Sequence, residues 1–339
     1  MRVSVIGAGS WGTTFAALVT QNADEVILWA RRAELAETIS TGHHNPDYLP
    51  GRSLPVSLRA TSDLEEALER ADVVVLAVPS HGFRTVLTEA VPFVPADIPV
   101  VSLAKGLEEG SLLRMTQVVH EVLGDRPDGR VGVLTGPNIA GEVMAGMPTA
   151  SVVAMGDLDC AASLQRLFMT GTFRVYTNPD VVGCEIAGVL KNVVAIAAGA
   201  AQGLGCGDNA RAALITRGLA ELTRLGLALG GNPLSFLGLA GIGDLVVTCT
   251  SRSSRNRHVG EELGRGRTLA EILADMHMVA EGVKSTPSVL ALAARAGVEM
   301  PIAEEVHAVL TGARTPVEGM ATLMLREAKA ELDGIGLAP

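Results

Sequence analysis

The sequence lacks the surplus of positive charge that a general nucleic-acid binder or a binder of anionic membranes needs. Its 339 residues include 27 Lys and Arg against 37 Asp and Glu, a net charge of -10. It also lacks any long biased tract, and 48% hydrophobic with 19% charged residues is typical of a globular protein. We therefore expect no nucleic-acid partner, and any basic site must be local.

Cysteine is scarce, and the four cysteines stand far apart, with no CxxC pair: Cys160, Cys184, Cys206 and Cys249. The seven histidines show no regular ligand spacing either. These absences argue against a metal site, and we expect reduced structural thiols and no metal. Cys249 could be a nucleophile, but it has no histidine or redox partner nearby in the sequence, so a buried thiol is favoured.

Unbroken apolar runs are also missing. Mean hydropathy is +0.33, yet Lys, Asn, Gln or Gly interrupt the longest apolar stretches before the roughly 20 residues of a bilayer span. We interpret these stretches as buried helices rather than integral membrane segments. Met1-Arg2 is followed at once by a strand-like run, which leaves no room for a signal peptide. We expect a cytoplasmic protein.

The chain length predicts two domains. The first half alternates Val/Ile/Leu-rich runs with amphipathic ones, a pattern typical of a parallel sheet covered by helices. Strands are predicted at 2–6, 25–30, 72–78, 100–103, 131–134, 150–154 and 173–176. Beyond about residue 178, long Ala/Leu/Gly segments predict an all-α domain. Its helices are expected at 185–201, 208–230 with Asp208 as the N-cap, 269–275, 285–296 and 321–332.

A glycine-rich turn follows the first predicted strand. Gly7, Gly9 and Gly12 have GxGxxG spacing and lead directly into a helical run. In that context they provide a tight turn, close approach of the backbone to a pyrophosphate, and helix–strand packing, and the helix N-terminus faces the phosphates. The alternative is a merely structural turn. We predict a Rossmann-type, dinucleotide-binding α/β domain over residues 1–184, followed by the all-α domain over 185–339.

Two arginines stand where an NAD-specific fold usually has an acidic residue. That acid, about 20 residues beyond the glycine turn, binds the ribose 2'-hydroxyl. Here the position is Ala30-Arg31-Arg32, and a guanidinium suits a 2'-phosphate through charge-assisted hydrogen bonds. We therefore predict that NADP(H) is accepted, while the choice between NADP(H) and NAD(H) stays open. The alternative is two solvated arginines at a helix start.

Lys191 is the most informative polar residue of the second half. It lies in a segment, 186–196, that is apolar on almost every helical face. Partial burial favours the neutral amine and can lower the pKa of a lysine towards the range useful for a general acid or base. The alternative is a lysine that extends to solvent from the edge of a helix.

Positive charge gathers at residues 250–258 (TSRSSRNRH), as a phosphate-binding loop requires. The segment has no aromatic residue, which makes single-stranded nucleic acid a poor alternative, although a solvated basic face stays open. Just upstream, Asp244 follows two glycines. Its carboxylate either lies close to a cationic partner or caps a helix.

Nine blocks of the chain, taken in order and spacing, resemble the bacterial-type NAD(P)-dependent glycerol-3-phosphate dehydrogenases. The blocks are 7–13 (GAGSWGT), 48–51 (YLPG), 78–81 (VPSH), 105–106 (KG), 135–137 (TGP), 190–193 (LKNV), 207–218 (GDNARAALITRG), 241–245 (GIGDL) and 254–257 (SRNR). The match covers nearly the whole chain. The 207–218 and 254–257 blocks are far more specific than the glycine turn.

The resemblance implies a set of site residues. The cofactor site would be lined by Ser10, Trp11, Arg31, Arg32, Lys105, Ala140, Val279 and Glu281, and Arg255 would touch both ligands. Substrate would be held by Lys105, Gly136, Asn138, Lys191, Asp244, Ser254, Arg255 and Asn256, with Lys191 as the proton acceptor. The sequence departs from the family pattern at Asn138, which can still donate and accept hydrogen bonds.

The resemblance also implies an activity. Members of the family reduce dihydroxyacetone phosphate to sn-glycerol 3-phosphate for glycerophospholipid synthesis, and they work as dimers. The expected partners are thus a phosphorylated three-carbon substrate and a second copy of the chain, which would meet through the helical domain. Two alternatives stay open: a related two-domain dehydrogenase of the β-hydroxyacid type, and a non-catalytic NADPH-binding redox sensor.

Overall fold

The computed structural model describes residues 1–124, 126–127, 129–276, 280–331 and 333–335. The chain forms two compact units. The first consists of Met1–Glu108 and Leu113–Val181, and the second of Glu109–Leu112 and Val182–Pro339. The main division after Val181 lies three residues before the expected one.

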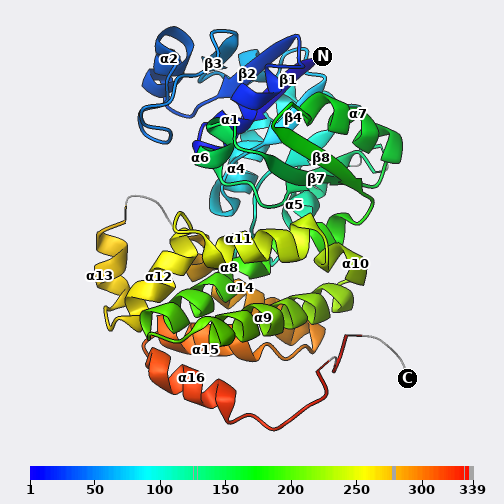
Figure 1. The fold of residues 1–339 in the computed structure, drawn as a ribbon. Helices are drawn as coiled ribbons and strands as arrows, with labels where there is room; N and C mark the ends of the chain where they lie inside the picture. The colour runs from blue at the N-terminus through cyan, green and yellow to red at the C-terminus, as the bar shows by residue number, and fades with distance from the viewer. Residues whose placement is uncertain (125, 128, 277–279, 332, 336–339) are drawn as a thin grey trace. The chain divides into compact units, whose positions relative to one another are not determined.

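The first unit is built on one eight-stranded sheet in the order β3-β2-β1-β4-β5-β6-β7-β8 (Figure 1). Neighbouring strands are parallel except β6 and β7, which are antiparallel, so the predicted parallel sheet is confirmed apart from this pair. The strand β3 was not expected from the sequence. The strands are β1 (Arg2–Ile6), β2 (Glu25–Trp29), β3 (Leu58–Thr61), β4 (Val73–Leu76), β5 (Val100–Ser102), β6 (Val131–Thr135), β7 (Thr149–Met155) and β8 (Phe173–Asn178).

Helices cover both faces of this sheet because its strands are apolar on both sides. Val73 and Val75 lie in one core cluster with residues of α1 and α7, whereas Val74 and Leu76 lie in another with residues of α3, α4 and α5. The α/β Rossmann-type fold is therefore confirmed. The helices of this unit are α1 (Ser10–Val19), α2 (Ala33–Gly42), α3 (Leu64–Leu68), α4 (Ser80–Ala90), the 3-10 helix η1 (Val91–Phe93), α5 (Met115–Leu123), α6 (Ala140–Met144) and α7 (Leu158–Phe168).

The described residues of the second unit form helices joined by turns and loops, with no strand (Figure 1). Its elements are α8 (Val181–Gly203), α9 (Asp208–Ala228), α10 (Pro233–Phe236), the π-helix η2 (Leu239–Gly243), α11 (Asp244–Thr250), α12 (Arg255–Gly264), α13 (Leu269–Ala274), α14 (Glu281–Ala296), α15 (Pro301–Leu310) and α16 (Pro316–Met324). The expected end of the last helix is wrong, because α16 stops at Met324. The expected N-cap of α9 is also wrong: Gly207 caps it, and Asp208 is its first residue.

The helix α8 is the core of the second unit. By length and composition it could span a membrane. The sequence analysis expected the polar residues in this stretch to make it too short for a membrane span. Within the structure, 83% of its most apolar window is buried, as in the core helix of a folded domain. A second stretch, Pro233–Thr250, passes the same test with 39% buried.

Glycine allows α8 and α12 to cross with their backbones in close contact. A Cβ on Gly199 or Gly203 of α8 would lie 2.0 or 2.1 Å from a carbonyl oxygen of α12. A Cβ on Gly260 or Gly264 of α12 would lie 1.9 or 2.4 Å from a carbonyl oxygen of α8. Any larger side chain would separate the two helices, and α12 begins with the polar segment expected to bind phosphate.

Candidate functional site

The glycine turn has the geometry of a dinucleotide cradle. Gly7 has a φ of +119°, and a Cβ there would lie 2.8 Å from the Ala77 carbonyl oxygen. A Cβ on Gly12 would lie 1.9 Å from the Gly7 carbonyl oxygen, so Gly12 lets α1 pack onto the turn. A Cβ on Gly9 would meet nothing within 4 Å, which leaves the backbone there open to a ligand.

The N-terminus of α1 supplies donors for an anion. Its first turn contains no acidic residue, and the first N–H groups of any helix lack intrahelical acceptors. The Ser10 hydroxyl donates to the Tyr48 carbonyl at 2.9 Å. The Trp11 ring packs 6.0 Å from that of Phe15, and its buried indole Nε1 has no hydrogen-bond partner among the described residues. Ser10 therefore offers a backbone rather than a side-chain group, and the cradle fits a pyrophosphate.

The two arginines after β2 differ in their surroundings. Arg32 is the N-cap residue of α2, and its guanidinium pairs with Asp47, which raises the pKa of Arg32. Arg31 is exposed, and no hydrogen bond or ion pair of its side chain is found among the described residues. The structure therefore leaves Arg31 available to a phosphate, whereas Arg32 would have to share its charge with Asp47.

Three of the expected ligand residues meet in the first unit. The Lys105 ammonium donates to the Gly136 carbonyl at 3.0 Å and to Asn138 Oδ1 at 2.9 Å. Asn138 Nδ2 in turn lies 3.4 Å from Ser151 Oγ. Ala140, another expected residue, begins α6, and its carbonyl oxygen lies 3.5 Å from Thr14 Oγ1 on α1.

The second unit buries a lysine–carboxylate pair. Lys191 is 6% exposed and Asp244 1% exposed, so the predicted burial of Lys191 is confirmed. Lys191 Nζ lies 2.5 Å from Asp244 Oδ1 and donates to Thr248 Oγ1 at 3.1 Å. The Thr248 hydroxyl donates to the Asp244 backbone carbonyl at 2.6 Å. The ammonium is thus held between α8 and α11, and Asp244 has the cationic neighbour that its sequence context suggested.

Cys249 lies beside this pair but is not suited to nucleophilic chemistry. Burial raises the pKa of its thiol to about 12; Lys191 opposes that rise and Asp244 adds to it. At neutral pH the group is therefore a thiol, and the thiolate is the nucleophilic form. The four cysteines are free. No group of His, Cys, Asp and Glu among the described residues could hold a metal ion.

The segment 250–258 is not the continuous loop that the sequence suggested, because α12 begins within it. Ser254 is the N-cap of α12 and accepts from the Arg257 N–H. Arg255 is exposed in the first turn. Arg257 is buried and pairs with Glu261 at 2.7 Å, so it belongs to the fold rather than to a phosphate site.

Asn256 joins three helices. Its Nδ2 donates to Asn192 Oδ1 at 2.9 Å, and its Oδ1 accepts from the Gly282 N–H at 2.9 Å. Asn192 follows Lys191 on α8, and Glu281, an expected cofactor residue, begins α14 just before Gly282. Val279, the other cofactor residue expected here, lies outside the described residues.

Two residues of these clusters were missed by the sequence analysis. Thr248 lies one helical turn after Asp244, and that i, i+4 spacing could have indicated it. Asn45 is fully buried and donates to the glycine turn at the Ala8 carbonyl. No local pattern marks Asn45, because its acceptor lies 37 residues away.

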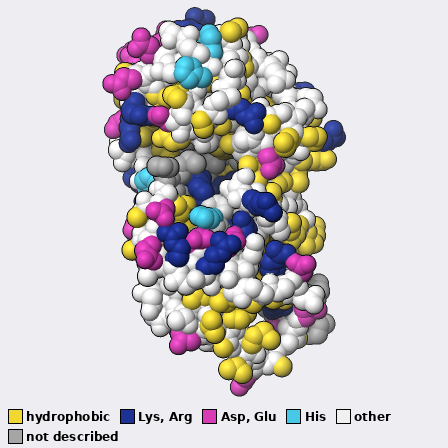
Figure 2. Space-filling view, turned by 60° about the vertical axis from the view of Figure 1, so that its left-hand side comes forward, with side chains coloured by type: hydrophobic (Ala, Val, Ile, Leu, Met, Phe, Trp, Pro, Cys, Tyr) yellow, Lys and Arg dark blue, Asp and Glu magenta, His cyan; other side chains and the backbone are white. Residues whose placement is uncertain are grey.

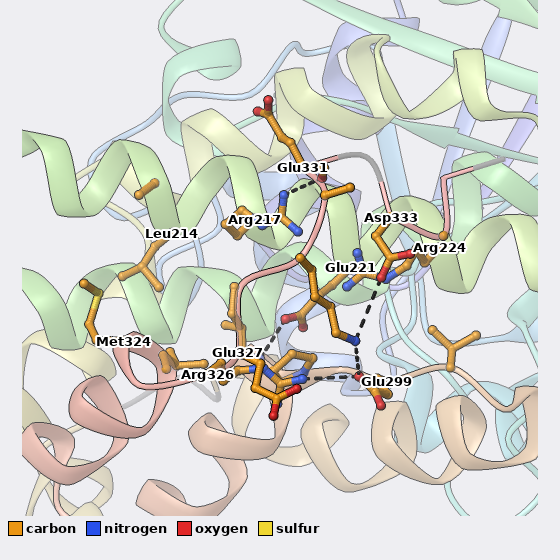
Figure 3. Close-up of a pocket in the computed structure, with 18 of the residues that line it drawn as sticks. Leu214, Arg217, Glu221, Arg224, Glu299, Met324, Arg326, Glu327, Glu331 and Asp333 are labelled. Carbon is orange, nitrogen blue, oxygen red and sulfur yellow. Dashed lines mark hydrogen bonds and ion pairs between the residues drawn. The ribbon is translucent and has the colours of Figure 1, made fainter. Parts of the chain in front are cut away.

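A cavity of about 1040 Å³ lies in the second unit, away from all the expected ligand residues. It is lined by residues of α9, the turn 297–299, the start of α15, α16, and residues within 326–331 and 333–334 (Figure 3). Glu221 of α9 is buried there, and its carboxylate accepts from the N–H groups of Ile302 at 2.7 Å and Ala303 at 3.4 Å. Figure 3 also shows the Arg217 guanidinium donating to the backbone of Glu331.

Comparison with known proteins assigns both units to one family. The family model described as NAD-dependent glycerol-3-phosphate dehydrogenase N-terminus matches residues 2–161, and the model of the C-terminus matches residues 180–321. A glycerol-3-phosphate dehydrogenase (NAD(P)+) of Sphingopyxis alaskensis is 57% identical over 318 residues, which are 94% of each chain. One from Streptomyces avermitilis is 52% identical over 98% of each chain.

A solved structure gives the same result. The glycerol-3-phosphate dehydrogenase of Coxiella burnetii matches with a TM-score of 0.90 and 38% sequence identity. The match covers 96% of this chain and 99% of that one, so both the sheet unit and the helical unit have counterparts.

Proposed function

The chain belongs to the NAD-dependent glycerol-3-phosphate dehydrogenase family, and from that membership we propose how its own residues bind the ligands and move the proton. The protein is an NAD(P)-dependent oxidoreductase that acts on the secondary alcohol of sn-glycerol 3-phosphate, and it reduces dihydroxyacetone phosphate in the reverse direction. The site residues, the cellular location and the oligomeric state are the parts that we propose.

The proposed cofactor site begins at the glycine turn. Gly7, Gly9 and Gly12 shape it, the backbone N–H groups of Ser10 and Trp11 receive the pyrophosphate, and Arg31 receives a 2'-phosphate. The open backbone at Gly9 supports this assignment. We assign further contacts with NADP(H) or NAD(H) to Arg32, Lys105, Ala140, Arg255, Val279 and Glu281. When bound, the nicotinamide supplies or accepts the hydride.

We propose Lys191 as the general acid of ketone reduction and the general base of alcohol oxidation. Its ammonium would give a proton to the substrate oxygen that becomes the hydroxyl, and the resulting amine would take that proton back in the reverse direction. Asp244 and Thr248 support this role because they fix the position of Nζ. Positive charge beside the developing alkoxide also lowers the barrier. The buried Lys191–Asp244 pair is the observation that carries the proposal.

The remaining substrate contacts are assigned to two groups of residues. Ser254, Arg255 and Asn256 would bind the phosphate at the start of α12, where helix N–H groups and an exposed guanidinium favour an anion. Lys105, Gly136 and Asn138 would bind the substrate in the first unit, a role supported by their mutual hydrogen bonds. Asp244 would contact the substrate in addition to its ion pair with Lys191.

The proposal is tested by NADPH oxidation on addition of dihydroxyacetone phosphate. The Lys191→Met variant removes the ammonium and keeps most of the side-chain volume. Turnover should fall by about 10²–10⁴-fold, the usual value of general acid–base catalysis, while NADPH affinity stays unchanged. Lys191→Met leaves the Asp244 carboxylate buried without its cation, which is destabilising, so the double variant Lys191→Met/Asp244→Asn is measured as well.

Lys284→Met is the matched control, because Lys284 is an exposed lysine of α14. It should keep wild-type turnover. If a folded Lys191→Met enzyme retained turnover within a few-fold of the wild type, another group would have to supply the proton and the assignment would be wrong.

We also propose that the protein is a cytoplasmic homodimer that supplies glycerol 3-phosphate for glycerophospholipid synthesis. Support for self-association comes from α16 and its end, where Val317, Met324 and Leu325 are 61%, 78% and 84% exposed. In Figure 2 hydrophobic side chains gather at the bottom of the molecule, where the view brings α16 forward. Light scattering should give twice the 35.1 kDa chain mass. The Met324→Glu variant should give the mass of a single chain. A monomeric wild type would exclude the dimer.

A further inference from the structure

We infer that Asn45 is a positioning residue, which fixes the orientation of the Ala8–Gly9 peptide so that the glycine turn offers an N–H group rather than a carbonyl to the cofactor. The inference rests on the proposed cofactor site. Asn45 is 0% exposed, and its Nδ2 donates to the Ala8 carbonyl at 3.0 Å and to Thr13 Oγ1 at 2.8 Å. One amide thus holds both the turn and the first turn of α1.

Peptide geometry turns this hydrogen bond into a constraint on the open face of the turn. All peptide bonds of the described chain are trans, so the Ala8 carbonyl and the Gly9 N–H point in opposite directions. With the carbonyl held towards the buried Asn45, the Gly9 N–H faces away from it. Gly9 is also the position where a Cβ would meet nothing within 4 Å.

Without that donor the peptide could rotate at low cost, because glycine tolerates most backbone conformations. Rotation would turn the Ala8 carbonyl oxygen, the negative end of the peptide dipole, towards the pyrophosphate. A buried carbonyl without a donor is itself destabilising. The amide of Asn45 removes both penalties in the native turn.

The loop around Asn45 fixes which end of its amide faces the glycine turn. Asn45 Oδ1 accepts from the Tyr48 N–H at 3.2 Å, and the Asn45 backbone carbonyl accepts from the Leu49 N–H at 2.9 Å. The Tyr48 carbonyl in turn accepts from the Ser10 hydroxyl. Because Oδ1 is taken by this local turn, the donor end Nδ2 must face Ala8 and Thr13.

The test uses Asn45→Asp, which preserves the volume of the side chain and replaces the donor with an acceptor. We expect the Kd for NADPH, followed by NADPH fluorescence without substrate, to rise about ten- to a hundredfold, as for a buried group left unpaired. The KM for dihydroxyacetone phosphate and kcat at saturating NADPH should stay within about threefold of wild type. That split separates an effect on the cofactor turn from a general loss of structure.

Asn22 provides a matched control at the opposite end of α1. Its Nδ2 also donates to two acceptors, here the backbone carbonyls of Leu167 at 3.1 Å and Met169 at 2.7 Å. Asn22→Asp makes the same chemical change far from the glycine turn. It should lower the Tm while the Kd for NADPH stays at the wild-type value.

Two further variants make every outcome decisive. If Asn45→Asp does not fold, Asn45→Ala is measured in the same way, because it removes the donor without introducing a charge. A wild-type Kd in a folded Asn45 variant, or an equal loss of affinity in Asn22→Asp, would overturn the inference. Gly9→Val tests the proposed cofactor site separately: if it left NADPH affinity intact, the turn would not bind the pyrophosphate at all.

Discussion

Arg31 and Arg32 adjoin in the sequence, but only Arg31 is left without a carboxylate partner among the described residues. We predict that Arg31→Ala lowers kcat/KM with NADPH by about ten- to a hundredfold, the value of a hydrogen bond to a charged group. The value with NADH should change little, since NADH has no 2'-phosphate. Steady-state kinetics give the ratio of kcat/KM with NADPH to kcat/KM with NADH. Equal losses with both cofactors would refute a 2'-phosphate contact.

Asp47 should have the opposite effect, because it neutralises Arg32. Removing the carboxylate in Asp47→Ala leaves the Arg32 charge free to attract a 2'-phosphate. The preference for NADPH over NADH should rise by up to about fivefold, the scale of an exposed ion pair. The gain should shrink at high salt, because exposed charges are screened. An unchanged cofactor preference at low salt would show that Arg32 does not approach the 2'-position.

Single residues were predictable only where their neighbours in sequence describe their surroundings. Burial of Lys191 followed from apolar residues on almost every side of the helix that carries it. The pairing of Arg32 with Asp47 and that of Asn45 with Ala8 span 15 and 37 residues. Each depends on how the 43–54 loop folds back onto the glycine turn, and no periodicity encodes that. The buried Arg257 is a further case, since its sequence context is indistinguishable from that of the exposed Arg255.

At the scale of elements, the close packing of α8 against α12 should determine the position of the proposed substrate-binding residues at the start of α12. Gly260→Ala would place a Cβ 1.9 Å from the Ile196 carbonyl oxygen, so α12 must move. We predict a loss of about 1–3 kcal/mol in the free energy of unfolding, as for other overpacked sites. The KM for dihydroxyacetone phosphate should rise because Asn256 moves with α12, whereas the Kd for NADPH should not change.

Gly171→Ala is the control for this crossing. A Cβ on Gly171 meets nothing within 4 Å, and its φ lies outside the left-handed region. Urea unfolding and initial rates should therefore stay near wild type for Gly171→Ala. A Gly260→Ala enzyme with wild-type stability and KM would mean that the two helices can separate at no cost to the site.

Elements were predictable where the apolar pattern is long. Six of the seven predicted strands coincide closely in position with β1, β2, β4, β5, β6 and β8, and the seventh falls within β7. The strand β3 was missed because Leu58–Thr61 is short and contains an arginine. The reversal of β7 was missed because an apolar run carries no information on its direction. The start of α12 was taken for a loop because its first residues are polar.

At the scale of the whole molecule, composition and motif order were sufficient to predict two domains and the family. They could not predict the cavity beneath α9, because its lining comes from segments up to 124 residues apart in the chain, from Ala210 to Gly334. Four residues of the specific 207–218 block, Ala210, Ala213, Leu214 and Arg217, line that cavity. Glu221, one turn further along α9, places a buried carboxylate in the same region.

Glu221 makes the stability of the molecule depend on pH. Burial raises the pKa of its carboxyl from 4.5 to about 7, although the N–H groups of Ile302 and Ala303 and the charge of Arg224 oppose that rise; Glu304 adds to it. The folded protein therefore binds a proton that the unfolded chain releases at a lower pH. The stability that this proton contributes is present in full below about pH 4.5 and is lost as pH rises through about 7.

Glu221→Gln removes the titration and keeps the shape of the side chain, so the difference in unfolding free energy between the wild type and this variant isolates the effect. Between pH 5 and pH 8.5 the wild type should lose roughly 2–3 kcal/mol relative to the variant, since each pKa unit is worth about 1.4 kcal/mol. Urea unfolding across that range measures it. Glu89→Gln, at an exposed position on α4, should follow the wild-type profile. If the difference in unfolding free energy between the wild type and Glu221→Gln did not change with pH, Glu221 would be ionised throughout this range. In that case the α15 N-terminus would stabilise the carboxylate more than burial destabilises it.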